Sequence, residues 1–402
     1  MNLTTMNNHE YGYRKLSGFL VLILLTAGSF AWSFDTKTSK AKLQALMSID
    51  GKDLTEKYGA SEILSFDVSP DNQTVVVGYR TAEQHHTASI SVGKWEIASK
   101  RLLATARLEE STDQDSAFVR LVFTPDGQLL ISQTDHAINI LDPNTLAIKR
   151  TIQISGDCSQ LSGDGHILAV RAWSQGKSSV HILDARSGEQ LGLWPEPEAF
   201  QHTVCPPLSF GGDQMLITAP GSGPNILLVD SLTGKVIRSF SIGFRHERAS
   251  PDNEIGSAAF IDTSRLIVAP SSDPGKSGRY SAKTLKVINA NTGELIHELV
   301  YRHLAPGHAP WVSASGSTLA LINAWRSRSQ NLSDADANVP IQLLLFRLDT
   351  TQPTCVVENL PMSGSTPEGA TSAVKPSPDL GIFGFRISNQ LTIYKIIGCN
   401  LH

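Results

Sequence analysis

A short phrase recurs along this chain of 402 residues. In each copy, an apolar segment runs into a turn rich in Ser, Thr, Pro, Asp and Gly, and a second apolar segment follows. Each copy therefore predicts a strand, a tight turn and another strand. Such a unit cannot bury its apolar side chains alone, so copies along one chain predict a repeat architecture. The copies lie at residues 66–71, 123–127 and 374–379, with weaker ones at 161–165 and 210–213.

A second element recurs after the first. Residues 180–184, 226–230 and 285–289 are apolar segments that end in Asp or Asn, and a Gly follows four residues later. Residues 138–145 follow the same pattern without the Gly. The Gly suits a turn position that needs a positive φ, and another apolar segment comes next. Each unit therefore predicts four short strands.

We count seven such units. The third and sixth are weakly marked, so a count of six or eight stays open. About 52 residues per unit exceeds the roughly 40–45 of a standard propeller repeat, and polar insertions account for the surplus. The first strands of the units are predicted near residues 63–68, 118–123, 157–161, 206–210, 256–261, 310–314 and 371–375.

The repeated phrases resemble those of the WD40 and YVTN-type β-propeller superfamily. The full WD40 signature is not present, because only Gly307–His308 and Trp95–Glu96 approximate its Gly-His and Trp-Asp pairs. A divergent bacterial-type member fits better. The resemblance implies an all-β fold, namely a seven-bladed β-propeller of four-stranded antiparallel blades over residues 42–402. We predict no cofactor.

Closure of the ring makes a separate prediction. The last unit ends after its third strand, residues 391–396, while the apolar residues 42–49 lie unused ahead of the first unit. A strand from residues 42–49 would complete the last blade and leave no open sheet edge. The alternative is a short helix over residues 40–47.

The N-terminus has the order of a secretory signal peptide. Arg14 and Lys15 precede an apolar stretch over residues 16–31, and the small residues Ser29 and Ala31 provide a cleavage site. We therefore predict a signal peptide over residues 1–31, a linker over residues 32–41, and a periplasmic or extracellular location. The alternative is an uncleaved signal anchor, which would give the protein its one contact with a membrane.

The four cysteines suit an oxidising compartment. The repeat register suggests the pairs Cys158–Cys205 and Cys355–Cys399, and four buried free thiols are the alternative. No Cys-x-x-Cys motif is present, and the adjacent His85 and His86 have no further ligands at metal-binding spacing, so we predict no metal site.

Cationic side chains gather in the polar insertions and inter-blade loops of the fifth and sixth units. These loops are predicted to open on one face and on adjacent blades, where they would favour an anionic protein loop or glycan. Nearby acidic residues can cancel this field, which leaves solvated loop charge as the alternative. The formal net charge of −4 gives no reason to expect nucleic acid. The predicted ligand-binding residues are Arg245, Arg248, Lys276, Arg279, Arg302, Arg326 and Arg328.

No catalytic motif is present in the sequence. There is no Gly-x-Ser-x-Gly, no phosphate-binding Gly-rich loop and no His-Glu-x-x-His, so we assign no catalytic residue. We expect a recognition platform for a protein or glycan. The alternatives are a hydrolase or lactonase acting in the central channel, and a structural subunit of an envelope complex. Charged side chains that converge in the channel would favour the enzyme, because perturbed groups cluster at catalytic sites.

Overall fold

The chain divides into two units, Met1–Thr36 and Lys37–His402. The computed structural model describes most of the second unit, and the predicted signal segment lies outside the described residues. Among the described residues, no helix is long and apolar enough to cross a membrane. The described ranges are 38–82, 88–111, 119–174, 176–196, 206–218, 226–242, 255–270, 284–300, 310–313, 315–323, 342–358, 360, 374–387 and 389–399.

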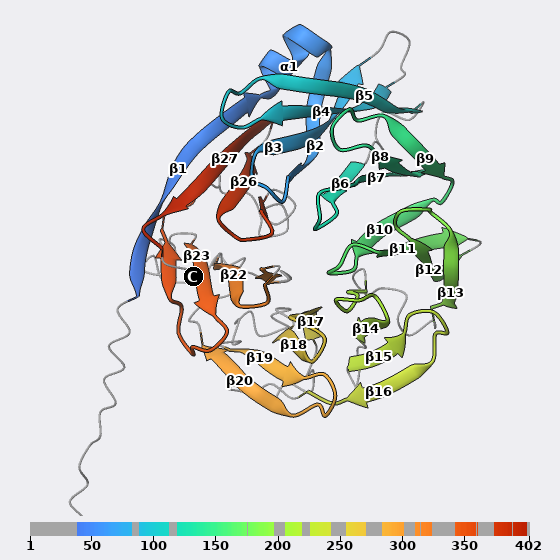
Figure 1. Ribbon diagram of the computed structural model, residues 1–402, viewed down its shortest axis with the longest axis vertical. Coiled ribbons are helices and arrows are strands. Elements are labelled where there is room, and N and C mark those ends of the chain that lie inside the picture. The colour runs from blue at the N-terminus through green and yellow to red at the C-terminus, as the bar shows by residue number, and fades with distance from the viewer. Residues whose placement is uncertain are drawn as a thin grey trace, which may run out of the picture. The chain divides into compact units, whose positions relative to one another are not determined.

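The described residues of the second unit form strands and one short helix, and the sheets follow one another around a centre (Figure 1). Four sheets have four antiparallel strands each, taken from consecutive segments of the chain. The first two comprise β2 (Ala60–Val68), β3 (Thr74–Ala82), β4 (Ala88–Glu96) and β5 (Leu102–Ser111), then β6 (Val119–Phe123), β7 (Leu130–Thr134), β8 (Ile138–Leu141) and β9 (Ile148–Ile152). The other two comprise β10 (Gly156–Leu161), β11 (Ile167–Ser174), β12 (Lys177–Asp184) and β13 (Gln190–Pro195), then β17 (Ile255–Phe260), β18 (Arg265–Pro270), β19 (Thr284–Asn289) and β20 (Leu295–Val300).

Two sheets depart from four strands. One has three, β14 (Gln214–Thr218), β15 (Ile226–Asp230) and β16 (Val236–Phe240), and a single bridge from Leu208 to Met215 stands where a first strand is predicted. The other sheet has eight strands because β1 joins two groups. In sheet order these are β21 (Trp311–Val312), β22 (Thr318–Asn323), β23 (Gln342–Arg347), β24 (Cys355–Val357), β1 (Ser39–Asp50), β27 (Gln390–Ile397), β26 (Ile382–Ile387) and β25 (Val374–Pro376).

Strand β1 links the beginning of the described chain to its end. Its first residues pair in parallel with β24, and residues from Lys42 to Asp50 pair antiparallel with β27. This is the pairing that the sequence predicts for residues 42–49, and it excludes a helix over residues 40–47. The strand begins at Ser39, inside the predicted linker over residues 32–41, because residues 39–41 already pair with β24.

The helix α1 (Gly51–Tyr58) follows β1 and was not predicted. Its ends carry ordinary capping signals. The side chain of Asp50 accepts a hydrogen bond from the backbone N–H of Lys52, and Gly59 ends the helix in the left-handed conformation. The apolar side chain of Leu54 packs into the core beside β2. The N-cap residue Asp50 and the C-cap residue Gly59 are visible in the sequence, and together they would have predicted this helix.

The apolar core lies between neighbouring groups of strands. Among the described residues there are seven clusters of buried apolar side chains. Six of them lie between neighbouring sheets, and the seventh lies within the eight-stranded sheet, where it joins β22–β24 to β25–β27. One cluster joins the last strands, β26 and β27, to the first sheet through Ile382, Leu391 and Phe66. Burial therefore runs continuously around the second unit, which stabilises each sheet through its neighbours.

The turn chemistry of the repeated phrase is as predicted. In each turn the Ser or Thr hydroxyl donates to an Asp carboxylate two or four residues later, and the hydroxyl accepts from a backbone N–H across the turn. These bonds hold the first and second strands of a sheet in register. The hydroxyl–carboxylate pairs are Ser69–Asp71, Thr124–Asp126, Ser162–Asp164, Ser209–Asp213 and Ser377–Asp379, at 2.6 to 2.7 Å.

The glycines of the second recurring element have a role beyond the turn itself. Each has a positive φ, and each contacts the outer strand of the preceding sheet so closely that a Cβ would overlap its neighbour. For Gly234, the added Cβ would lie 2.5 Å from Cδ1 of Trp194 on β13. The pairs are Gly188 with Ile152, Gly234 with Trp194 and Gly293 with Phe240.

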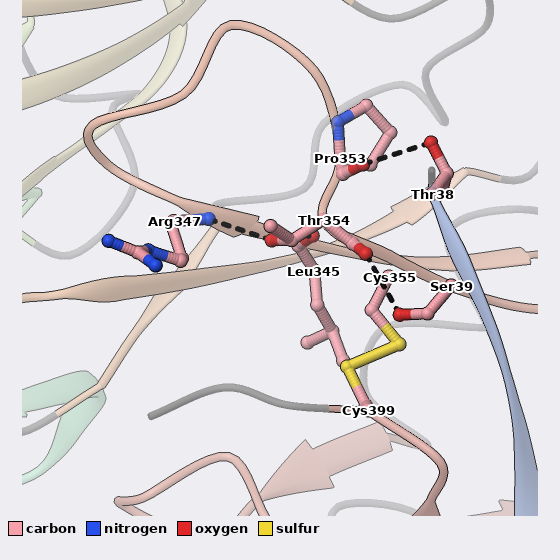
Figure 2. Close-up of a disulfide and its surroundings, with 8 residues drawn as sticks. All are labelled: Thr38, Ser39, Leu345, Arg347, Pro353, Thr354, Cys355 and Cys399. Carbon is pink, nitrogen blue, oxygen red and sulfur yellow. Dashed lines mark hydrogen bonds between the residues drawn. A yellow bond between two sulfur atoms is a disulfide. The ribbon is translucent and has the colours of Figure 1, made fainter. Parts of the chain in front are cut away.

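A disulfide joins Cys355 to Cys399, with 5.9 Å between their Cα atoms (Figure 2). Cys355 lies on β24 and Cys399 follows β27, so the bond connects the two strands between which β1 inserts. Ser39 of β1 is the register partner of Cys355 and donates to the carbonyl of Thr354 at 3.1 Å. This is the pair that the sequence suggests. Cys158 is also disulfide-bonded, and its suggested partner Cys205 lies outside the described residues.

Candidate ligand site in the central cavity

The predicted basic loop sector cannot be placed. All seven of its residues fall outside the described ranges, as do His85, His86, His303 and His308. Among the described residues, no group of three or more His, Cys, Asp or Glu side chains is arranged to hold a metal ion. The site that the described residues do form lies elsewhere, at the centre of the sheets.

A cavity of about 620 Å³ lies where the first strands of the sheets meet. Each of the seven predicted units contributes to its lining the residue that lies two positions before the one that opens the turn. This register is shared because the turn fixes the strand that precedes it. The seven residues are Asp67, Val122, Gln160, Pro207, Ala259, Trp311 and Lys375.

Asp67, on β2, bonds to the neighbouring strand β6. Its carboxylate accepts a hydrogen bond of 2.8 Å from the backbone N–H of Phe123. Two residues earlier on β2, the hydroxyl of Ser65 accepts a longer bond of 3.4 Å from the N–H of Leu121. Because β6 pairs with β7 on one edge only, its other edge faces the cavity with unpaired backbone groups. Side chains of β2 satisfy these groups.

Lys375, on β25, bonds to the same open edge from the other direction. Its Nζ donates to the carbonyl of Leu121 at 2.8 Å. The bond connects β25, in the last group of strands, to β6, although the sheet β2–β5 comes between them in the order of the sheets. Asp67 and Lys375 therefore close the polar edge of β6 from two different sheets.

Arg120 belongs to β6 and differs from these two residues. Within the described residues, its side chain forms neither an ion pair nor a hydrogen bond. It interacts with Asp67 and Lys375 only through longer-range electrostatics. Arg120 is half-buried and lines the cavity. The cavity thus contains a cation to which no described residue bonds directly.

Burial shifts the ionisation of all three groups toward their neutral forms. Burial raises the pKa of the Asp67 carboxyl above its ordinary value, against the attraction of Lys375 and the bond from Phe123. Burial lowers the pKa of Lys375 to about 8, and Arg120 adds to this effect while Asp67 opposes it. The pKa of Arg120 is also lowered by burial, and Asp67 opposes the shift.

The charges gather on one part of the wall and apolar side chains on another. Asp67, Arg120 and Lys375 come from β2, β6 and β25, which are neighbouring first strands. The wall formed by β17, β21 and the segment around residue 208 presents Leu208, Phe260 and Trp311, besides several polar groups. Asp262 is the second carboxylate among the described residues of the lining, and it accepts a hydrogen bond of 2.7 Å from Arg265.

The Asp-containing turn that the sequence predicts for each phrase accounts for every Asp of the phrases except one. Asp71 and Asp379 do bond within their turns, but Asp67 precedes its turn and lines the cavity. Aligning the phrases at their turn residues would have shown that Asp67 and Lys375 share one register position. No such signal marks Arg120.

Comparison with known proteins shows the fold. No family model and no curated protein matches this chain. Among solved structures, the crystal structure of the Cps50 (Swd1) β-propeller domain of Myceliophteria thermophila matches with a TM-score of 0.52 and 12% identity. The match covers 88% of this chain and 99% of that one. The likeness, at this identity, concerns the fold alone, and it confirms a β-propeller of antiparallel sheets.

Proposed function

We propose that this chain is an exported, seven-bladed β-propeller that serves as a platform for binding a protein or glycan partner. The observation that carries the proposal is the closed ring of sheets around a small cavity. In this cavity the ionisable side chains of Asp67 and Lys375 are held by hydrogen bonds to the backbone of β6. A rigid frame of this kind presents its connecting loops in fixed positions.

Two observations support a count of seven blades. The cavity is lined by one register-equivalent residue from each of the seven predicted units, and among the described residues seven clusters of buried apolar side chains lie between neighbouring groups of strands. The eight-stranded sheet then consists of two blades, β21–β24 and β25–β27 with β1, which stay connected because β1 pairs with a strand of each.

Export is supported by the signal-like order of residues 1–31 and by the disulfides. The bond between Cys355 and Cys399 and the disulfide of Cys158 suit an oxidising compartment, since disulfides rarely persist in the cytosol. A membership in the YVTN-type bacterial propellers stays part of the proposal, because it rests on the sequence phrases.

The cavity favours binding over catalysis. Convergent, perturbed groups in a channel would favour an enzyme, and Asp67 and Lys375 are such groups. Their hydrogen bonds, however, go to backbone atoms of β6 rather than to each other or to a nucleophile. A general base must reach the proton that it removes, and these two groups already hold structural partners.

A capture experiment tests the proposal. The mature protein, immobilised and exposed to envelope and culture-medium fractions, is expected to retain a partner that a loop variant loses. The loop variant carries the substitutions Arg245→Glu, Arg248→Glu, Arg326→Glu and Arg328→Glu. A matched control makes the same change in charge at exposed sites outside these loops, with Lys52→Glu, Lys57→Glu, Lys177→Glu and Lys235→Glu.

Each outcome separates the candidate functions. A partner held by the wild-type protein and the control, but lost by the loop variant, supports recognition through the loops. A partner held by all three proteins favours the structural subunit of an envelope complex. If no partner is captured and an ester or lactone is hydrolysed, the proposal is replaced by the enzyme.

A further inference from the structure

The cation of Arg120 is the feature of the cavity that the ring itself does not explain. A guanidinium has about five N–H donors and keeps its proton at any physiological pH. Within the described part of the chain, the Arg120 side chain has no hydrogen-bonded or ion-paired protein group. Leaving a half-buried charge without a partner costs free energy, which an anion in the cavity would recover.

The charge balance of the lining also favours an anion. When ionised, Arg120 and Lys375 face one carboxylate among the described residues, that of Asp67. The other lining carboxylate, Asp262, is already bonded to Arg265. Asp67 accepts from a backbone N–H, so its oxygens are only partly available to the two cations. The charged part of the wall therefore carries an excess of positive charge.

The remaining wall selects among anions. Leu208, Phe260 and Trp311 line the same cavity from other blades, and they would contact the apolar part of a ligand. A carboxylate suits a guanidinium because two parallel N–H donors match its two oxygens. The volume of about 620 Å³ admits a small organic acid.

The geometry points to a second binding site in this protein: the central cavity binds a small organic carboxylate, with Arg120 as its anion receptor and the apolar wall around Trp311 as the contact for its body. Lys375 adds positive charge beside Arg120 while it stays bonded to Leu121. The site does not depend on the proposed loop partner, since every residue in it belongs to the inner strands and the cavity.

Calorimetric titration of the full mature protein with three probes tests the site. Benzoate combines a carboxylate with an apolar ring, benzyl alcohol keeps the ring without the charge, and inorganic phosphate keeps the charge without the ring. We expect benzoate to bind with a Kd of about 1 mM or lower, and each other probe at least about tenfold more weakly.

Two variants identify the receptor. Arg120→Gln should weaken benzoate binding by about tenfold or more, because the amide cannot form the charged, two-point contact. Arg238→Gln, at an exposed position of β16, removes the same charge away from the cavity and should leave binding unchanged. Equal benzoate affinity in wild type and Arg120→Gln would overturn the proposal, as would equal binding of benzoate and benzyl alcohol, or no binding of benzoate.

A pH titration of the wild-type protein keeps the proposal falsifiable if Arg120→Gln does not fold. Lys375 has a pKa of about 8. Among the described residues, the charged groups that face it are Asp67 on β2 and Arg120 on β6. Benzoate remains ionised throughout, so its affinity should fall as pH rises from about 7 to 9 and Lys375 loses its proton. An affinity that is constant or rises over this range would contradict the site.

Discussion

Replacing Gly234 by Ala should destabilise the protein for two separable reasons. Gly234 has a φ of +69°, where an L-residue costs about 1–2 kcal/mol. Its added Cβ would also lie 2.5 Å from Cδ1 of Trp194, on the preceding blade. Overpacking of this kind costs about 1–3 kcal/mol. Ala also restricts the unfolded chain, which offsets about 0.4–1 kcal/mol of this cost, so the expected net loss is about 1–5 kcal/mol.

Two other glycines separate these contributions. Gly59 has a φ of +67° but no atom within 4 Å of an added Cβ, so Gly59→Ala reports the backbone cost of about 1 kcal/mol. Gly211 has neither a positive φ nor a close neighbour, and Gly211→Ala should be neutral or slightly stabilising.

Guanidinium unfolding, followed by circular dichroism, measures the differences as shifts in midpoint at constant slope. Gly234→Ala should cost less stability in a Trp194→Leu background than in the wild-type protein, because the smaller Leu side chain leaves room for the Cβ. Comparing the double variant with the two single variants measures this difference. If Gly234→Ala costs no more stability than Gly59→Ala, the close contact between Gly234 and Trp194 adds no cost of its own, and the reasoning fails.

Two further predictions concern the ring closure and the cavity. Cys399→Ser opens a disulfide that spans 44 residues, and the chain-entropy estimate of about 4 kcal/mol predicts a loss of about 2–4 kcal/mol in non-reducing guanidinium unfolding; unchanged stability would mean that pairing of β1 alone closes the ring. For Lys375, the folded-state pKa of about 8 lies below the unfolded value of 10.5, so the unfolded state binds more protons between these pH values and stability rises with pH there. Lys375→Met should flatten this rise in unfolding midpoints measured across that range, and parallel curves for the two proteins would contradict the assignment.

The repeating part of the fold could be predicted because its causes are local. Strand, turn and strand follow from apolar runs and from the hydroxyl–carboxylate pairs, such as Ser69 with Asp71, that lie within a few residues of each other. The use of residues 42–49 as the closing strand followed from the one strand missing at the end of the last unit. The helix at Gly51–Tyr58 was missed although its capping residues were visible in the sequence.

The candidate site could be predicted only in part. The sequence contains the register that places Asp67 and Lys375 on the cavity wall, yet it gives no reason to connect Lys375 with Leu121, 254 positions away. The predicted basic loops remain a prediction, since their residues lie outside the described ranges.

The sequence by itself therefore determined the repeating unit, its turns and the strand that closes the ring, because neighbouring residues fix those conformations. Only the tertiary structure decided which groups meet at the centre. Ring closure brings the first strands of distant units together, exposes the unpaired edge of β6 to the cavity, and buries Arg120 beside Lys375 and Asp67. Such proximity depends on how the blades pack, and no local pattern in the chain encodes it.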